Sequence, residues 1–312
     1  MKPVHICILG TSLLAGCGFG GPSLGPVDTS VSLTDARKGF VSTLKPIGAE
    51  KEPVDEPSAR VFRKLKFPAP PGQLAAYLTP DPKDGQKHPA IIWITGGDCN
   101  SIGDVWSAAK PDNDQTAAAF RKAGIVMMFP SLRGGNDNPG VKESFLGEVD
   151  DILAAADFLA KQPYVDPARL YLGGHSTGGT LVLLTAECSD RFRAVFSFGP
   201  VEDVAGYPPE YLPFDQRNPK EIELRSPGRW LHSIKSPVFV LEGTNGGNLS
   251  SLQAMARGNS NPKVQFLPVR GATHFSILAP VTKLLATKVL ADSGPTCTIS
   301  LSEGELNKLF GR

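Results

Sequence analysis

The sequence has little net charge, few histidines and no long apolar run, and each shortage narrows the choice of function. Its 312 residues include 32 basic and 31 acidic side chains, so no field of one sign steers the chain toward nucleic acid. No group of residues has metal-ligand spacing and no glycine-rich phosphate loop is present, so the sequence implies no cofactor. With 41% apolar residues, the composition is that of a globular protein long enough for one large domain.

The amino-terminal residues have the pattern of a signal peptide. The apolar run from Ile6 to Leu14 is too short to span a bilayer and follows a lysine. Its ending, Leu14-Ala15-Gly16-Cys17, resembles the lipobox of bacterial lipoproteins, in which the cysteine becomes the lipid-modified first residue. We therefore expect a signal peptide over residues 1–16 and a cell-envelope protein held on the periplasmic side of a membrane by a lipid on Cys17. An ordinary signal peptide or a buried strand is the alternative.

The rest of the chain divides by composition into three parts. Residues 17–58 are dense in glycine, proline and charge, which predicts a tether with one short helix within residues 33–44. Residues 59–291 are expected to form the α/β domain, and residues 292–312 an extension to which the sequence assigns no purpose. In an oxidising compartment two of three cysteines could pair, or all three are small buried residues; these are Cys99, Cys188 and Cys297.

The main part of the chain alternates between strand and helix patterns. Residues 60–80 have the pattern of a two-stranded hairpin. Six short apolar runs then follow, typical of parallel strands buried on both faces, at 90–95, 125–130, 168–174, 194–199, 238–243 and 264–269. Helical spacing lies between them at 147–161, 178–186 and 282–290. This alternation predicts a mostly parallel, doubly wound α/β sheet with helices on both faces.

The motif that carries chemistry is Gly174-His175-Ser176-Thr177-Gly178, placed between a predicted strand and a predicted helix. This is the context of a nucleophile elbow, in which flanking glycines permit a tight, strained turn that exposes the serine hydroxyl. The motif predicts Ser176 as the nucleophile, against the alternative of a glycine-rich loop. One oxyanion donor should be the N–H of Thr177, and the second the N–H of Gly97 or Asp98, in the loop after strand 90–95.

The general base is found by elimination among five histidines. His5 lies in the signal peptide, and His88 precedes a strand at the edge of the sheet expected to lie opposite the active site. His175 is next to the nucleophile, and its side chain is expected to point away from the nucleophile. His232 lies in a segment between two strands. His274 remains, and it follows the last predicted strand, where the order serine, acid, histidine expects the base.

The acid of the triad is harder to assign, because the loop after strand 238–243 contains no aspartate. Glu242, at the carboxyl end of that strand, is the first candidate for the group that orients the histidine. Asp203, together with its neighbour Glu202, follows the preceding strand and is the alternative. A serine–histidine dyad oriented by an amide such as that of Asn245 is the third possibility.

Residues 60–290 resemble the α/β-hydrolase superfamily, and within it the prolyl oligopeptidase-like and dienelactone hydrolase-like proteins. The likeness is carried by the elbow and by five further segments: Pro130–Gly135, Asp150-Asp151, Val165–Leu170, Ser226-Pro227 and Ile234–Val238. The resemblance implies a serine hydrolase that works through an acyl-enzyme. One departure concerns the acid, because the family's usual His-Gly-x-x-Asp is replaced here by Glu242-Gly243-Thr244-Asn245-Gly246.

Three functions follow from these observations. We expect the substrate to be a small carboxylic ester, since the larger peptidases of the family carry a β-propeller for which 312 residues leave no space. A hydrolase of short peptides is the rival enzyme, and a non-catalytic binding lipoprotein with the same fold is the rival from another class. The aromatic and proline-rich residues 206–232 are expected to form either a short cap over the site or a packed loop.

Overall fold

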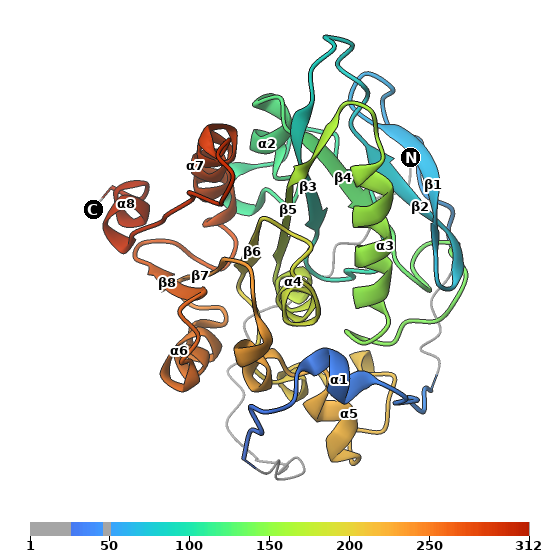
Figure 1. Ribbon diagram of the computed structural model, residues 1–312, viewed down its shortest axis with the longest axis vertical. Coiled ribbons are helices and arrows are strands. Elements are labelled where there is room, and N and C mark those ends of the chain that lie inside the picture. The colour runs from blue at the N-terminus through green and yellow to red at the C-terminus, as the bar shows by residue number, and fades with distance from the viewer. Residues whose placement is uncertain (1–25, 46–50, 312) are drawn as a thin grey trace.

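The computed structural model describes residues 26–45 and 51–311 and is built around one eight-stranded sheet (Figure 1). The predicted signal peptide and Cys17 lie outside the described residues. The strand order is β1-β2-β4-β3-β5-β6-β7-β8, antiparallel from β1 to β4 and parallel from β4 to β8. The strands are β1 Arg63–Ala69, β2 Gly72–Leu78, β3 His88–Ile94, β4 Val126–Pro130, β5 Val165–His175, β6 Ala194–Phe198, β7 Val238–Gly243 and β8 Val264–Val269. The predicted hairpin and the six predicted parallel strands are confirmed.

Helices cover both faces of this sheet. One face carries α3 Glu148–Ala160, α4 Thr177–Cys188 and α6 Leu249–Gly258, and the other carries α2 Ala118–Lys122, α7 Leu278–Ala291 and α8 Glu303–Lys308. Successive strand residues point to opposite faces, so Ile92 packs in one core and Trp93 in the other, both at most 1% exposed. Because both faces are buried, most positions along β3, β4, β6 and β7 are apolar, which is the pattern that the sequence shows.

The amino-terminal segment packs on the domain. Its helix α1, Leu33–Arg37, begins at the capping residue Ser32 and lies beside α5, Pro219–Glu223 (Figure 1). Leu33 is fully buried, and the Arg37 guanidinium donates to the carbonyl oxygens of Leu224 at 2.7 Å and Phe145 at 2.9 Å. Of the residues expected to form a tether, 26–45 are therefore held in place, and the short helix expected there is present.

The residues after α7 also pack on the domain. Asp292 is fully buried and accepts hydrogen bonds from Arg193 Nε at 2.7 Å and from the Tyr171 hydroxyl at 2.7 Å. Asp292 thus attaches the start of the extension that contains α8 to β5 and to the residue before β6.

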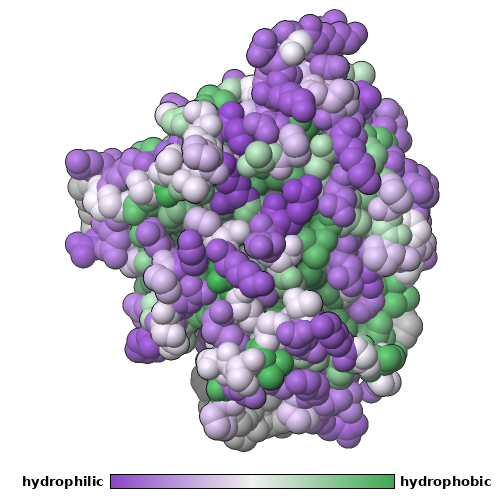
Figure 2. Space-filling model, in the orientation of Figure 1, coloured by the Kyte–Doolittle hydropathy of each residue, from purple (hydrophilic) through white to green (hydrophobic). Residues whose placement is uncertain are grey.

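Polar and apolar side chains are interspersed on the face shown in Figure 2. No helix of residues 26–45 or 51–311 is long and apolar enough to cross a membrane. Cys99, Cys188 and Cys297 are separate thiols, so the disulfide considered from the sequence is not formed.

Candidate active site

Ser176 stands in the strained turn between β5 and α4. Its backbone has φ 56° and ψ −117°, a conformation that costs a residue with a side chain about 1–3 kcal/mol. The turn is tight: a Cβ added to Gly178 would lie 2.3 Å from the carbonyl oxygen of Ile94. The Ser176 N–H donates to the Phe198 carbonyl at 2.7 Å, which fixes the turn to the carboxyl end of β6.

His274 and Glu242 form a close pair beside this turn. His274 lies in the loop between β8 and α7, and its Nδ1 is 2.7 Å from Oε2 of Glu242. Glu242 is fully buried, and its carboxylate also accepts the N–H groups of Gly243 at 2.6 Å and Asn248 at 3.0 Å. An ionised carboxylate only accepts, so the His274 proton sits on Nδ1 and leaves Nε2 free to take another.

Gly199, directly after β6, brings this pair and the elbow together. It has φ 58°, and a Cβ there would lie 2.5 Å from Cε1 of His274 and 2.7 Å from Oε2 of Glu242. Its neighbour Phe198 accepts the hydrogen bond from Ser176. The turn that carries Ser176 and the His274–Glu242 pair therefore lie at the same strand end. Within the described residues the Ser176 hydroxyl has no hydrogen-bond partner, and such bonds are often long in an enzyme without substrate.

The other candidate acids have different partners. Asp203 caps a short 3₁₀ helix, Val204–Gly206, by accepting the N–H of Ala205 at 2.8 Å, and it also accepts the Ser226 hydroxyl at 3.1 Å. The N–H of Asn245 donates to the carbonyl of Ala272 at 3.0 Å. Of the three candidates for orienting His274, the structure brings Glu242 to it.

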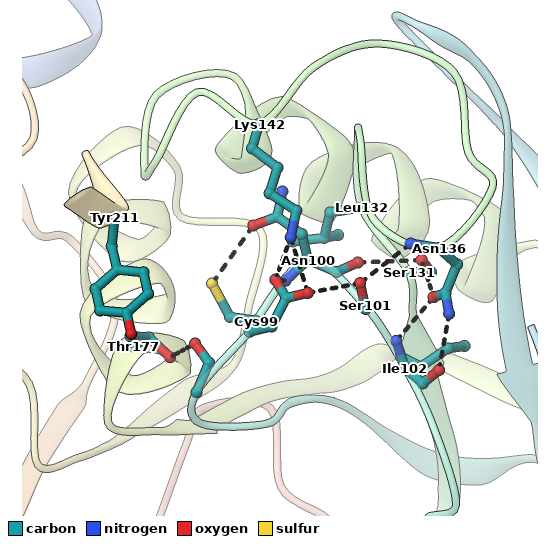
Figure 3. Close-up of polar contacts among 12 residues, drawn as sticks. Cys99, Asn100, Ser101, Ile102, Ser131, Leu132, Asn136, Lys142, Thr177 and Tyr211 are labelled. Atoms are coloured by element: carbon teal, nitrogen blue, oxygen red, sulfur yellow. Dashed lines mark hydrogen bonds and ion pairs between the residues drawn. The ribbon is translucent and has the colours of Figure 1, made fainter. Parts of the chain in front are cut away.

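The loop after β3 lies against the first turn of α4. The Thr177 hydroxyl donates to the Gly97 carbonyl at 2.9 Å (Figure 3), and Gly97 has φ 77°. Neither the Thr177 nor the Gly97 N–H has a hydrogen-bond partner among the described residues, which is the state expected of oxyanion donors. The Asp98 carboxylate is turned away into an ion pair with Lys142 at 2.8 Å.

Side chains of the loop after β4 hold this loop. The Asn100 carbonyl accepts the N–H of Leu132 at 2.7 Å and the Ser131 hydroxyl at 3.0 Å, and Asn136 accepts the N–H of Ile102 at 2.9 Å (Figure 3). These bonds fix the residues that follow β3 to the loop after β4.

Aromatic residues near the site divide into buried and exposed groups. Within residues 206–232, Phe214 and Trp230 are at most 4% exposed and serve the packing of the segment, whereas Tyr211 is 56% exposed. Phe275 is 45% exposed and stands edge-on to the His274 ring, with 4.9 Å between centroids. Of these side chains, Tyr211 and Phe275 are the ones open to a ligand.

Sequence reasoning gave His175 no role and missed Gln115. The His175 side chain was expected to point away from the nucleophile; its Nε2 lies 2.9 Å from the backbone carbonyl oxygen of His274. Gln115 Nε2 lies 2.8 Å from the other ring nitrogen of His175. No motif marks Gln115, because sixty residues separate the two partners and only the fold brings them together.

The comparisons with known proteins agree with this geometry. Residues 111–257 match the prolyl oligopeptidase family. The chain is 24% identical over 222 residues to the "Uncharacterized peptidase YtmA" of Bacillus subtilis, which covers 61% of this chain and 80% of that protein. The chain is a serine hydrolase of the α/β-hydrolase fold.

Other similar proteins are much longer than the hydrolase. It is 33% identical over 112 residues to "Prolyl oligopeptidase A" of Amanita bisporigera, but this covers 34% of the hydrolase and 13% of that relative. A solved puromycin-hydrolyzing peptidase of Mycobacterium tuberculosis matches with a TM-score of 0.58 and 22% identity, over 78% of the hydrolase and 41% of that chain. The hydrolase thus spans less than half of these two proteins, and the structural match supports the fold.

Proposed function

We propose that the hydrolase cleaves short peptides through an acyl-enzyme, with Ser176 as nucleophile, His274 as general base and Glu242 as the acid that orients it. The observation that carries the proposal is the Glu242–His274 pair at 2.7 Å, held by Gly199 at the strand end that also binds the elbow. A buried carboxylate with two backbone donors has no other evident task than to fix this imidazole.

The reaction follows from the positions of these groups. Ser176 Oγ attacks the scissile carbonyl carbon while His274 Nε2 takes the hydroxyl proton. The N–H of Thr177 and that of Gly97 or Asp98 donate to the oxyanion. His274 then gives the proton to the leaving amine, and the C–N bond breaks. A water molecule, deprotonated by His274, attacks the ester of Ser176 and releases the acid.

Peptides are preferred over esters as substrates on the strength of the comparisons. The family match and the relative of similar length both concern peptidases. The sequence alone favours carboxylic esters, and esters remain the second candidate because the same acyl-enzyme forms from either and an alkoxide leaves more easily than an amine.

The test is active-site labelling followed by kinetics. A fluorophosphonate probe should label Ser176, and labelling should be lost in Ser176→Ala and in His274→Ala. Hydrolysis of a dipeptide anilide and of the matched ester is then compared as kcat/KM. No labelling of the folded chain would contradict the proposed catalytic role, and turnover of the ester alone would return the preference to esters.

We also propose that the chain is a lipid-anchored protein of the cell envelope, modified at Cys17. The run Leu14-Ala15-Gly16-Cys17 after a short apolar stretch supports this. Expression in a bacterium fed a labelled fatty acid should give a labelled, detergent-phase protein, and Cys17→Ala should abolish the label. An unlabelled wild-type chain in the aqueous phase would contradict the anchor.

A further inference from the structure

Gln115 and His175, two side chains outside the triad, connect the loop after β3 with the loop after β8 that carries His274. The N–H of Gly96, next to Gly97, donates to Gln115 Oε1 at 3.0 Å. Gln115 Nε2 lies 2.8 Å from Nδ1 of His175, and His175 Nε2 lies 2.9 Å from the carbonyl oxygen of His274. Three hydrogen bonds thus run from the loop after β3, past the nucleophile, to the histidine after β8.

The partners fix the direction of every bond in this series. A backbone N–H only donates, so the amide oxygen of Gln115 must face Gly96 and its NH₂ must face His175. Nδ1 of His175 therefore accepts, and the ring proton lies on Nε2, where a backbone carbonyl accepts it. The second N–H of Gln115 donates to Asn113 Oδ1 at 2.9 Å, so the amide is fully used.

The series passes close to the nucleophile. A Cβ added to Gly96 would lie 2.9 Å from His175 Nδ1 and 3.1 Å from Cβ of Ser176. The His175 ring is fully buried, and its centroid is 4.5 Å from that of His274. Burial, and to a lesser degree the charge of His274, lowers the pKa of His175 to about 3. A protonated ring would also turn an N–H toward the NH₂ of Gln115, so the bonds require the neutral form.

We propose that Gln115 and His175 are positioning residues, which hold the backbones of Gly96 and His274 at a fixed separation across Ser176. This inference rests on the proposed function. The bond to Gly96 fixes the peptide next to the Gly97 N–H, and the bond to His274 fixes the residue that carries the base. Neither side chain needs to touch the substrate, and neither donates or removes a proton in the reaction.

The activity test removes the amide and keeps the length of the side chain. Gln115→Met should lower kcat about 10- to 100-fold and change KM less than twofold, because small displacements of catalytic groups have effects of this size. Gln162→Met is the matched control and should leave kcat unchanged, since among the described residues that half-buried side-chain amide bonds only to the Phe158 carbonyl on α3. Equal kcat values in the two variants would overturn the proposal.

A second measurement is independent of turnover. In the wild-type chain, ¹⁵N-imidazole NMR should show His175 as the Nε2–H tautomer without titration between pH 5 and pH 8. Gln115→Glu places two accepting oxygens in the series and should move a proton onto Nδ1. An Nδ1–H tautomer in the wild type, or titration in this range, would overturn the proposal. Full activity of Ser176→Ala would instead contradict the proposed function. The tautomer of His175 would still show whether the hydrogen bonds through Gln115 and His175 are formed.

Discussion

Glu242 reaches His274 from within strand β7, with 2.7 Å between Oε2 and Nδ1. An acid on a strand has less freedom than one on a loop, and here the backbone of Gly243 and Asn248 fixes it further. The loop after β7 lacks the usual aspartate, and Glu242 takes its place. The longer glutamate side chain begins at the penultimate residue of β7 and still reaches His274.

Replacing this acid tests its role directly. Glu242→Gln should lower kcat roughly 10³- to 10⁴-fold, because an amide in place of the carboxylate no longer selects the Nδ1–H tautomer or stabilises the imidazolium. Steady-state kinetics on the better substrate of the dipeptide anilide and the matched ester measures this. Asp203→Asn is the control, and it should change kcat less than twofold, since Asp203 caps a 3₁₀ helix. A large loss in Asp203→Asn with none in Glu242→Gln would reassign the acid.

Gly199, which lies between the elbow and the His274–Glu242 pair, gives a second prediction. Gly199→Ala places a methyl group 2.5 Å from the His274 ring at a positive φ, so the ring must move. We expect kcat to fall at least about 10-fold and the free energy of unfolding to fall by about 1–3 kcal/mol. Gly206→Ala, whose added Cβ meets nothing closer than 3.8 Å, should change kcat little. Calorimetry and kinetics on both variants check this, and an active Gly199→Ala chain would contradict the geometry.

A buried carboxyl group predicts how stability depends on pH. Glu187 on α4 is 2% exposed, and within residues 26–45 and 51–311 neither of its carboxyl oxygens has a hydrogen-bond partner. Burial raises the pKa of Glu187 well above its ordinary 4.5, and the charge of Arg37 opposes this. The folded chain then keeps a proton that the unfolded chain has lost, so the free energy of unfolding falls as pH rises above about 4.5.

Glu187→Gln removes that titration. The variant should be more stable than the wild type by roughly 1–3 kcal/mol at pH 8 and by much less at pH 5. Urea unfolding at the two pH values measures the difference. If wild type and variant lose stability in parallel as the pH rises, Glu187 is not the group responsible.

The attachment of α1 gives the last prediction. Arg37→Met removes guanidinium bonds to the carbonyls of Leu224, Phe145 and Leu146, and should lower the free energy of unfolding by about 2–3 kcal/mol. Limited proteolysis should then cut within residues 26–45 before the domain unfolds. Lys38→Met, which loses an exposed pair with Asp35, should leave the free energy of unfolding nearly unchanged. A protease-resistant Arg37→Met chain would show that other contacts hold the segment.

The sequence predicts those parts of the structure that depend on neighbouring residues. Ile91 to Ile94 predict a buried strand because each position is apolar, and the elbow glycines predict the turn at Ser176 because the turn is local. Helix α6 was not predicted, since its polar residues obscure the apolar positions Leu252 and Met255. The contact of Gln115 with His175 and that of Arg37 with Leu146 could not be predicted, because the partners are 60 and 109 residues apart in the chain.

The packing of α1 against α4 would also limit where substrate is met. An extended chain between Cys17 and Leu33 reaches at most about 55 Å. With a lipid on Cys17, α1 and the neighbouring helix α5 (Figure 1) would stay near the bilayer, α1 within that distance of it. The enzyme would then draw its substrates from a thin layer next to the membrane, and its effective rate would depend on what diffuses through that layer.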